Sequence, residues 1–237
     1  MTLQGTNVVI VGGSTGMGFA TAKLAKQQGA NITITGRSVE KLAQAKSELG
    51  EVRTVAADFS DEAASAQIFD GLDRVDHVFI AAGNLQLGSL LEADISTLRP
   101  AFEERIWGPL YVVRSCAPRM PEGGSVTLTS GIRASRPVSG TSIVSAACAA
   151  GETLAVAMAL ELAPIRVNAI APGWIDTPAI ASLLGDNRET VLNSEAAALP
   201  VKRIGTPEEI AEAVVMLMNN RFISGEVLHI DGGGRYV

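Results

Sequence analysis

Cysteine and histidine are scarce in this sequence. Its 237 residues include two cysteines and two histidines. The pair Cys116 and Cys148 cannot build a disulfide framework, which predicts a reducing, cytoplasmic setting. No cluster of His, Cys and Asp has the spacing of metal ligands, so we expect no metal site.

Basic runs and secretory features are also missing. Lysine and arginine number 19 against 25 acidic residues, and the formal net charge is −6. Without a basic run, nucleic-acid binding is not expected. The opening "MTLQGTNVVIVGG" has no charged leader region, and no apolar run looks long enough and free enough of charge to cross a bilayer. We therefore expect no signal peptide and no membrane partner.

Aromatic residues make up only 4% of the chain, whereas 47% of it is hydrophobic. Plentiful Gly, Ala, Val and Ile suit helices that pack closely on a buried parallel sheet. Strand-like runs alternate with helix-like segments along the whole chain. The strand candidates are residues 7–13, 31–36, 52–58, 75–83, 124–131, 165–173 and 225–233. This order predicts one domain over residues 1–237, an α/β, Rossmann-like, doubly wound parallel seven-stranded sheet with helices on both faces.

A glycine-rich loop, "VGGSTGMGFA" at residues 11–20, joins the first strand to the first helix. Such a tight turn needs backbone angles that side chains forbid, hence glycine. The helix that follows points its free N–H groups and positive dipole end at the loop, which makes a pyrophosphate cradle. A ligand-free turn is the alternative, but the position between strand and helix favours binding. The expected cofactor contacts are Gly12, Ser14, Thr15, Gly16, Met17 and Gly18.

The end of the second strand discriminates between dinucleotides. An NAD site usually has an acid there, on the ribose 2′-hydroxyl. In "TITGRSVE" the first acid, Glu40, comes too late, and Arg37 and Ser38 take the position. A guanidinium pairs well with a 2′-phosphate, so the sequence predicts NADP(H). The alternative is a surface arginine that caps the next helix.

Two residues at the end of the third strand complete the predicted nucleotide site. Asp58, in "ADFS", is placed to meet the adenine edge, or else to cap the following helix. Phe59 stands next to it and is assigned to the same site.

Several motifs together resemble the short-chain dehydrogenase/reductases over essentially the whole chain. They are the spacing Gly12-x3-Gly16-x-Gly18, "IAAG" (80–83), "APGWIDT" (171–177) and "SGEVLHIDGG" (224–233). The resemblance implies that Ala82, Gly83, Pro172, Gly173, Ile175 and Thr177 also contact the cofactor. It further implies a small-molecule substrate, a lid around residues 178–200, and a homodimer or homotetramer built through two long helices and the C-terminal strand.

By resemblance, the family's chemistry uses a tyrosine, a lysine one helical turn further on, a serine and an asparagine, in acid–base and oxyanion-stabilising roles. Ser130, at the end of the fifth strand, stands in the serine position. Spacing forward from that serine puts the tyrosine at Ile143 and the lysine at Ala147. Counting back along the helix from "ELAP" gives Val144 and Cys148 instead. We favour the helix count, because loops accept insertions more easily than helices.

Neither register supplies a phenol or an ammonium. The chain's tyrosines are Tyr111 and Tyr236, and no lysine lies between Lys46 and Lys202. The serine is thus retained, whereas the tyrosine and lysine positions hold other residues.

Arg105 occupies the asparagine position, three residues before Gly108. An arginine keeps its charge and donates hydrogen bonds, but it is a poor proton donor. We hypothesise that Arg105 fills space vacated by the lysine and either grips the cofactor or binds an anionic substrate. Alternatively it turns outward to Glu103 or Glu104.

Two further charged residues lie close to these positions in the sequence. Arg133, shortly after Ser130, either adds to an anion-binding mouth or is a solvated loop charge. Glu152, on the predicted catalytic helix, is expected to be an exposed helix residue.

Three functions remain open on this evidence. The first is an NADP(H)-dependent oxidoreductase that acts on a small carbonyl, imine or conjugated substrate through a non-standard proton path, since hydride transfer is mainly the cofactor's chemistry. The second is an NADP(H)-binding sensor or subunit with impaired catalysis. The third is redox-neutral use of the same pocket.

Overall fold

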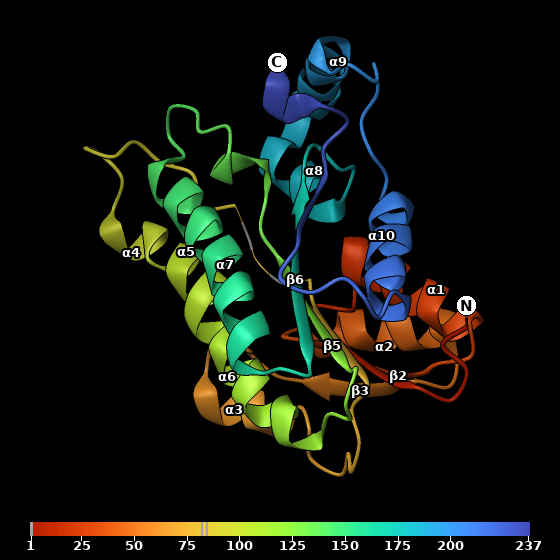
Figure 1. The fold of residues 1–237 in the computed structure, drawn as a ribbon. Coiled ribbons are helices and arrows are strands. Elements are labelled where there is room, and N and C mark those ends of the chain that lie inside the picture. The colour runs from red at the N-terminus through yellow and green to blue at the C-terminus, as the bar shows by residue number, and fades with distance from the viewer. Residues whose placement is uncertain (1, 82, 84) are drawn as a thin grey trace.

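A computed structural model describes residues 2–81, 83 and 85–237, and Figure 1 shows their arrangement. Within these residues, seven strands form one sheet in the order β3-β2-β1-β4-β5-β6-β7, with every neighbouring pair parallel. The strands are β1 Asn7–Val11, β2 Asn31–Gly36, β3 Arg53–Ala56, β4 His77–Ile80, β5 Ser125–Thr129, β6 Arg166–Pro172 and β7 Val227–Ile230. The predicted Rossmann-like fold class is confirmed.

Helices cover both faces of the sheet. On one face lie α1 Gly16–Gln27, α2 Val39–Leu49 and α10 Pro207–Asn219. On the other lie α3 Glu62–Gln67, α6 Gly108–Cys116 and α7 Ser142–Glu161. The remaining helical segments are α4 Ile95–Leu98, α5 Pro100–Phe102, the π-helix η1 Glu103–Trp107, α8 Pro178–Leu184 and α9 Arg188–Ala198, with short 3-10 turns η2 Ala117–Arg119, η3 Ile132–Ala134, η4 Gly185–Asn187 and η5 Gly234–Tyr236.

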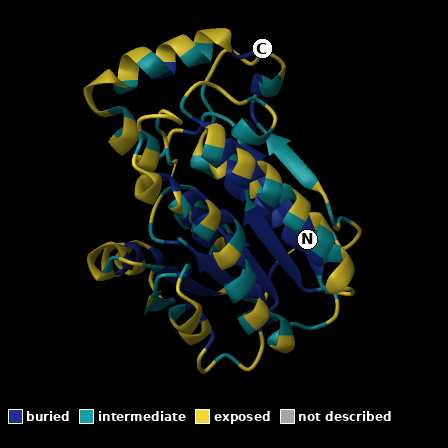
Figure 2. Cartoon of the chain, turned by 90° about the vertical axis from the view of Figure 1, so that its left-hand side faces the viewer, coloured by how far each residue is buried: buried dark blue, intermediate teal, exposed yellow. Residues whose placement is uncertain are grey.

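The central strands are buried on both sides, which explains their continuous apolar sequences. In β1, Val8 and Ile10 pack into the core under α1 and α10, whereas Val9 and Val11 pack into the opposite core. Successive side chains of a strand point to opposite faces, so each strand must supply apolar residues to two layers. Figure 2 shows this buried centre beneath helices whose outer faces are exposed.

Arg166 links the sheet to the end of α10. Its guanidinium is buried and donates to the carbonyl oxygens of Leu217 at 2.8 Å and Met218 at 2.9 Å. These carbonyl oxygens lie in the last turn of α10, where they have no intrahelical donor and where the helix end carries a partial negative charge. A cation on β6 thus anchors α10 against the sheet.

One helix, α7, is long and apolar enough to cross a membrane when length and composition alone are considered. On those two criteria our expectation of no sufficient apolar run is wrong. The helix packs on β6, β5 and η1, and the core helix of a water-soluble domain passes the same test. The finding is therefore weak evidence for a membrane span.

The segment around 178–200 folds as α8, η4 and α9. Thr177 caps the first of these helices, because its hydroxyl accepts a hydrogen bond from the backbone N–H of Ile180. The order of strands reverses between β1 and β4, so the connections that follow these two strands run to opposite faces of the sheet and leave a crevice between them, where such folds bind ligands.

Candidate functional site

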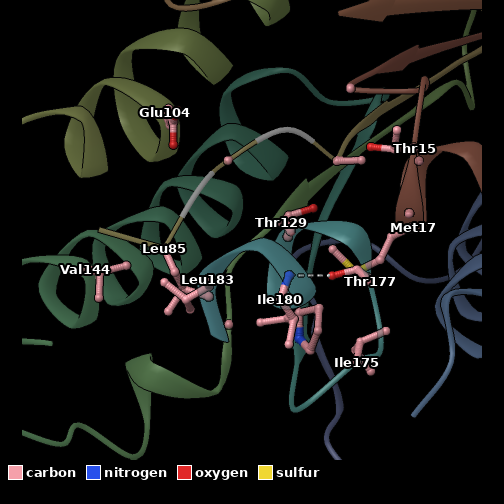
Figure 3. Close-up of a pocket in the computed structure, with 18 of the residues that line it drawn as sticks. Thr15, Met17, Leu85, Glu104, Thr129, Val144, Ile175, Thr177, Ile180 and Leu183 are labelled. Atoms are coloured by element: carbon pink, nitrogen blue, oxygen red, sulfur yellow. Dashed lines mark hydrogen bonds between the residues drawn. The ribbon is translucent and has the colours of Figure 1, made fainter. Parts of the chain in front are cut away.

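A pocket of about 960 Å³ occupies this crevice. Figure 3 shows its lining side chains, with Thr15 and Met17 at one end and Leu85, Val144 and Leu183 at the other. The predicted cofactor residues that line it are Gly12, Ser14, Thr15, Gly16, Met17, Gly18, Arg37, Ser38, Asp58, Phe59, Gly83, Pro172, Gly173, Ile175 and Thr177. Ala82 lies outside the described residues. Tertiary structure thus brings together segments from both halves of the chain.

The glycine loop has the geometry of a phosphate cradle. Gly12 and Gly16 have φ values of +83° and +55°, which favour glycine. A Cβ atom on Gly18 would overlap the carbonyl oxygen of Gly12. Thr15, the N-cap of α1, makes no side-chain capping bond, so the first N–H groups of this helix, whose first residues line the pocket, are left for another acceptor. The residues present therefore fit a pyrophosphate group.

At the second strand, two cations line the pocket. Arg37 and Lys41, the latter in the first turn of α2, both line the pocket and are both exposed. Our sequence reasoning missed Lys41, although its place one turn after Arg37 was the available signal. The hydroxyl of Ser38 donates to Glu40 at 2.8 Å and accepts from the N–H of Lys41, so it caps α2. The charges at this end suit a phosphate.

Asp58 does not cap the following helix, because Asp61 takes that position and accepts a hydrogen bond from the N–H of Ala64. Asp58 lines the pocket, and one carboxylate oxygen accepts hydrogen bonds from the hydroxyl and the N–H of Ser60 at 2.6 and 3.0 Å. Burial alone would raise the pKa of Asp58, but the Ser60 hydrogen bonds and the charge of Arg37 outweigh it and lower that pKa. Asp58 is held as a carboxylate at the nucleotide end.

The sixth strand delivers the loop at the opposite end. A Cβ atom on Gly173 would lie 2.8 Å from the α-carbon of Asp231, so the loop needs glycine to pass β7. Ile175 is buried and pairs with Gly205 in an isolated bridge. The hydroxyl of Thr177 accepts from the Ile180 N–H, which leaves its own proton free to donate into the pocket.

Ser130, where β5 ends, is 5% exposed and lines the pocket. Its hydroxyl donates to the carboxylate of Glu152 at 2.8 Å and faces the carbonyl oxygen of Cys148 at 3.2 Å. Our expectation that Glu152 is an exposed helix residue is therefore wrong, because it is partly buried and bonded to Ser130. The missed signal was its place one turn after Cys148, on the same face of the helix.

Arg105 lies inside the wall of the pocket. It is 7% exposed, and its Nε and Nη1 have no hydrogen-bond partner within the described residues. The guanidinium contacts Gly83, three residues after the end of β4. The side chain is thus turned into the protein and not outward to solvent. A guanidinium with unused N–H groups at a pocket wall can donate hydrogen bonds to an oxygen or an anion.

The π-helix η1 places Arg105 there. One turn from Glu103 to Trp107 is wider than an α-helical turn, a feature that often marks functional sites. Gly151 of α7 packs beside it, since a Cβ atom on Gly151 would lie 3.3 Å from the carbonyl oxygen of Arg105. The close approach of α7 helps to close the wall around the guanidinium.

The sequence profile of a family described as enoyl-(acyl carrier protein) reductase matches residues 11–234. The short-chain dehydrogenase/reductase malC of Malbranchea aurantiaca is 33% identical, with 98% of this chain and 95% of that protein covered. This chain belongs to the short-chain dehydrogenase/reductase family. It is an NAD(P)-dependent oxidoreductase of that type.

Other relatives and solved structures agree with this assignment. The cis-4-hydroxycyclohexanecarboxylate dehydrogenase of Sinomonas cyclohexanicum is 31% identical, covering 95% of this chain and 94% of its own length. The structure of the MalC reductase/Diels-Alderase from Malbranchea aurantiaca superimposes with a TM-score of 0.93 at 30% identity, covering 99% of this chain and 98% of that one. A small-chain dehydrogenase in complex with NADPH gives a TM-score of 0.87 at 29% identity, with 99% and 100% covered.

Within this short-chain dehydrogenase/reductase, the pocket distinguishes the two registers considered for the tyrosine and lysine. Val144 and Cys148 line the pocket and are almost fully buried. Ile143 and Ala147 do not belong to the described lining of the pocket. This geometry favours the register counted along the helix.

Metal-ligand clusters are absent from the described part of the chain.

Arg133 also lines the pocket, on η3. Burial lowers the pKa of Arg133, an effect that the charge of Glu195 partly offsets and that of Arg136 reinforces. Its Nη1 donates to the carbonyl oxygen of Arg136 at 3.3 Å. Arg133 is therefore a partly desolvated cation at the pocket and not a freely solvated loop charge.

The mouth of the pocket has an apolar wall. Leu85, Leu87, Val138 and Leu183 line it, yet each is exposed on the surface. Exposed apolar side chains gathered around an opening mark a binding site for an apolar group. They come from three separate loops and helices, so only the folded chain assembles them.

Proposed function

We propose that this protein is an NADP(H)-dependent reductase of an activated C=N or conjugated C=C–C=O group, working without a tyrosine–lysine pair. The observation that carries the proposal is the joint presence of an intact cofactor cradle and of Val144 and Cys148 at the tyrosine and lysine positions. A pocket that keeps the cofactor cradle, and whose described lining includes no tyrosine, suits a substrate that needs little help from an acid.

The choice of NADP(H) over NAD(H) rests on charge. Arg37 and Lys41 line the nucleotide end, and the first acid after the second strand, Glu40, is held by the Ser38 hydroxyl. Two cations favour a 2′-phosphate, and the second strand ends without the acid that usually accepts from a 2′-hydroxyl in an NAD site. The NADPH-bound relative supports the same choice by analogy.

The substrate end supplies hydrogen bonds and apolar contact. Bound NADPH would deliver a hydride, which converts an iminium ion directly to an amine with no proton from the protein. With a conjugated carbonyl, the charge that develops on the oxygen would be stabilised by the unpartnered guanidinium of Arg105. Leu85, Val138 and Leu183 would hold an apolar part of the substrate.

Redox-neutral use of the pocket is the second candidate, because the similar MalC protein is described as a reductase/Diels-Alderase. Such a reaction would use the shape of the pocket and the Arg105 donors without consuming NADPH. An NADP(H)-binding sensor or subunit with impaired catalysis is the third candidate, and the absent tyrosine–lysine pair supports it.

The deciding experiment titrates the purified protein with NADPH by fluorescence and then follows NADPH absorbance. Two substrates distinguish hydride transfer from proton donation. Reduction of an N-methyl cyclic iminium salt needs only a hydride, whereas reduction of cyclohexanone needs a hydride and a proton. We expect saturable binding, reduction of the iminium salt and little reduction of the ketone. Binding without turnover of either, or of a conjugated enone, would favour the sensor. Absence of NADPH binding at millimolar concentration would overturn the proposal.

We also propose a cytoplasmic protein that assembles as a homodimer or homotetramer. The cysteines Cys116 and Cys148 are buried and unpaired, as suits a reducing compartment. Trp107, Val156 and Leu160 are exposed apolar side chains on η1 and α7, which pack against each other. Covering this face with a second copy would bury them, as the family resemblance suggests.

A further inference from the structure

The single proton of the Ser130 hydroxyl is held by the protein itself. Its two neighbours, the Glu152 carboxylate at 2.8 Å and the Cys148 carbonyl oxygen at 3.2 Å, are both acceptors. A serine hydroxyl has one proton and two lone pairs. With Glu152 as a carboxylate, the charge-assisted bond takes the proton. With Glu152 protonated, the acid donates to Oγ and the serine proton turns to the Cys148 carbonyl oxygen.

We propose that Glu152 is a positioning residue that makes Ser130 a hydrogen-bond acceptor toward the substrate. The inference rests on the proposed function only in placing the substrate next to Ser130. By resemblance, a serine in this position donates to a carbonyl oxygen. Here its proton is already engaged, so the pocket side of Oγ offers lone pairs. The group it selects carries its own proton: the N–H of a protonated imine or amine, or a hydroxyl.

The same wall supplies a separate donor, which removes the need for Ser130 to donate. Arg105 is buried with Nε and Nη1 unpartnered, and both it and Ser130 line the pocket. The hydrogen-bond donor of the pocket wall therefore comes from η1, and the acceptor comes from the end of β5. A substrate oxygen belongs at Arg105 and a substrate N–H or O–H at Ser130.

A purely structural role for Glu152 makes a different prediction. The Ser130–Glu152 bond also fastens the end of β5 to α7, so its loss would lower stability in either case. Only the positioning role changes which ligand the pocket prefers. A ratio of two affinities, measured on the same variant, cancels the loss of stability and of negative charge.

The experiment measures that ratio by calorimetric titration of the protein saturated with NADP⁺. The two probes are 1,2,3,4-tetrahydroisoquinolinium, which has N–H donors, and its N,N-dimethyl analogue, which has the same ring and charge but none. The variants are Glu152→Ala, Ser130→Ala, their double variant, and Glu161→Gln as a matched control at an exposed site on the same helix. Glu152→Gln serves if the alanine variant does not fold.

We expect wild type and Glu161→Gln to prefer the N–H cation about tenfold or more, the factor that 1.4 kcal/mol gives. Ser130→Ala should remove most of this preference. Glu152→Ala and Glu152→Gln should each lower it, because the serine proton then has only the longer contact to the Cys148 carbonyl oxygen, or a weaker neutral acceptor, to hold it. The double variant should give the same ratio as Ser130→Ala alone, because Glu152 acts only through Ser130.

Three results would overturn the inference. They are an unchanged ratio in Glu152→Ala, a further change on adding Glu152→Ala to Ser130→Ala, or no binding of the N–H cation at millimolar concentration. If NADP⁺ gives no heat, the proposed cofactor fails on its own account. The ratio measured without cofactor then decides the role of Glu152.

Discussion

The guanidinium of Arg105 lies directly against the backbone of Gly83. A methyl group on Gly83 would overlap Nη1 of Arg105 and stand 2.7 Å from its Cζ. The glycine therefore makes the room in which a buried cation reaches the pocket. Burying a charge without partners costs free energy that a ligand can recover by binding it. This pair therefore supports the proposal that Arg105 binds an oxygen or an anion.

Replacing Arg105 should separate stability from activity. Arg105→Met removes a buried charge with unpartnered N–H groups, so we expect thermal stability to hold or to rise by about 1–3 kcal/mol. Activity (kcat/KM) toward a conjugated enone should fall at least about tenfold, as expected when a charge-stabilising donor is lost. Thermal denaturation and NADPH oxidation measure the two effects. Gly83→Ala, which displaces the guanidinium, should lower activity in the same way. A large loss of stability with activity intact would contradict this account.

The two cations at the nucleotide end should set the cofactor preference. Arg37→Ala and Lys41→Ala each remove a charge that we place near the 2′-phosphate, so each should weaken NADPH binding about tenfold. NADH affinity should change little in either variant. Fluorescence titration with both dinucleotides gives the ratio. Lys46→Ala removes the same charge from an exposed position of α2 outside the pocket, and its ratio should match wild type. Equal losses for NADH and NADPH would argue against a 2′-phosphate contact.

Restoring a phenol and an ammonium should restore ordinary carbonyl chemistry. Val144 and Cys148 line the pocket one helical turn apart, which is the spacing of the family's pair. The double variant Val144→Tyr/Cys148→Lys should reduce cyclohexanone measurably, because a proton donor is then present. The variant Val144→Phe/Cys148→Met adds comparable bulk without a titratable group and should stay inactive on the ketone. If both variants behave alike, the missing pair is not what limits the wild type.

Acid should destabilise the fold through His77. Burial lowers the pKa of His77 to about 4, from an ordinary value near 6.5, although the charge of Asp76 opposes this. The unfolded chain therefore binds the proton more tightly, and stability falls as the pH drops from about 6.5 toward 4. The loss should approach about 3 kcal/mol at the lower end. Urea unfolding at pH 7 and pH 5 should give a smaller difference for His77→Gln than for wild type. An equal difference in both proteins would place the acid sensitivity elsewhere.

The exposed apolar face of η1 and α7 should govern assembly. Leu160 is 79% exposed and Trp107 is 47% exposed, and both would be buried if a second copy covered this face. Leu160→Glu should therefore convert a dimer or tetramer into a smaller species, because an unpaired charge would be desolvated at the contact. Light scattering after size-exclusion chromatography measures the mass. Val39→Glu changes an equally apolar exposed residue on α2 and should leave the mass unchanged. A monomeric wild type would remove the basis of this proposal.

Much of the architecture follows from local patterns. Apolar runs of strand length alternate with helical segments, and a run such as "NVVIV" can only be satisfied by burial on both faces. The cofactor loop can be predicted from its glycines. The backbone angles at Gly12 and Gly16 and the crowding at Gly18 exclude side chains, so glycine must stand at these positions. The expectations that failed concern single side chains. From the sequence alone, Glu152 is expected to be an exposed acid on a helix, and Lys41 is not distinguished from other surface lysines.

The sequence by itself determined the alternation of strands and helices in an α/β domain, the glycine loop that predicts a phosphate cradle, and the lack of tyrosine and lysine in residues 142–161, since each depends on residues close together in the chain. Tertiary structure alone decided that Ser130 meets Glu152 and that Arg105 turns inward against Gly83. These contacts join segments about twenty residues apart, through the packing of α7 and η1 on the sheet. Whether a charged side chain faces solvent or a pocket depends on that packing, which no local pattern encodes.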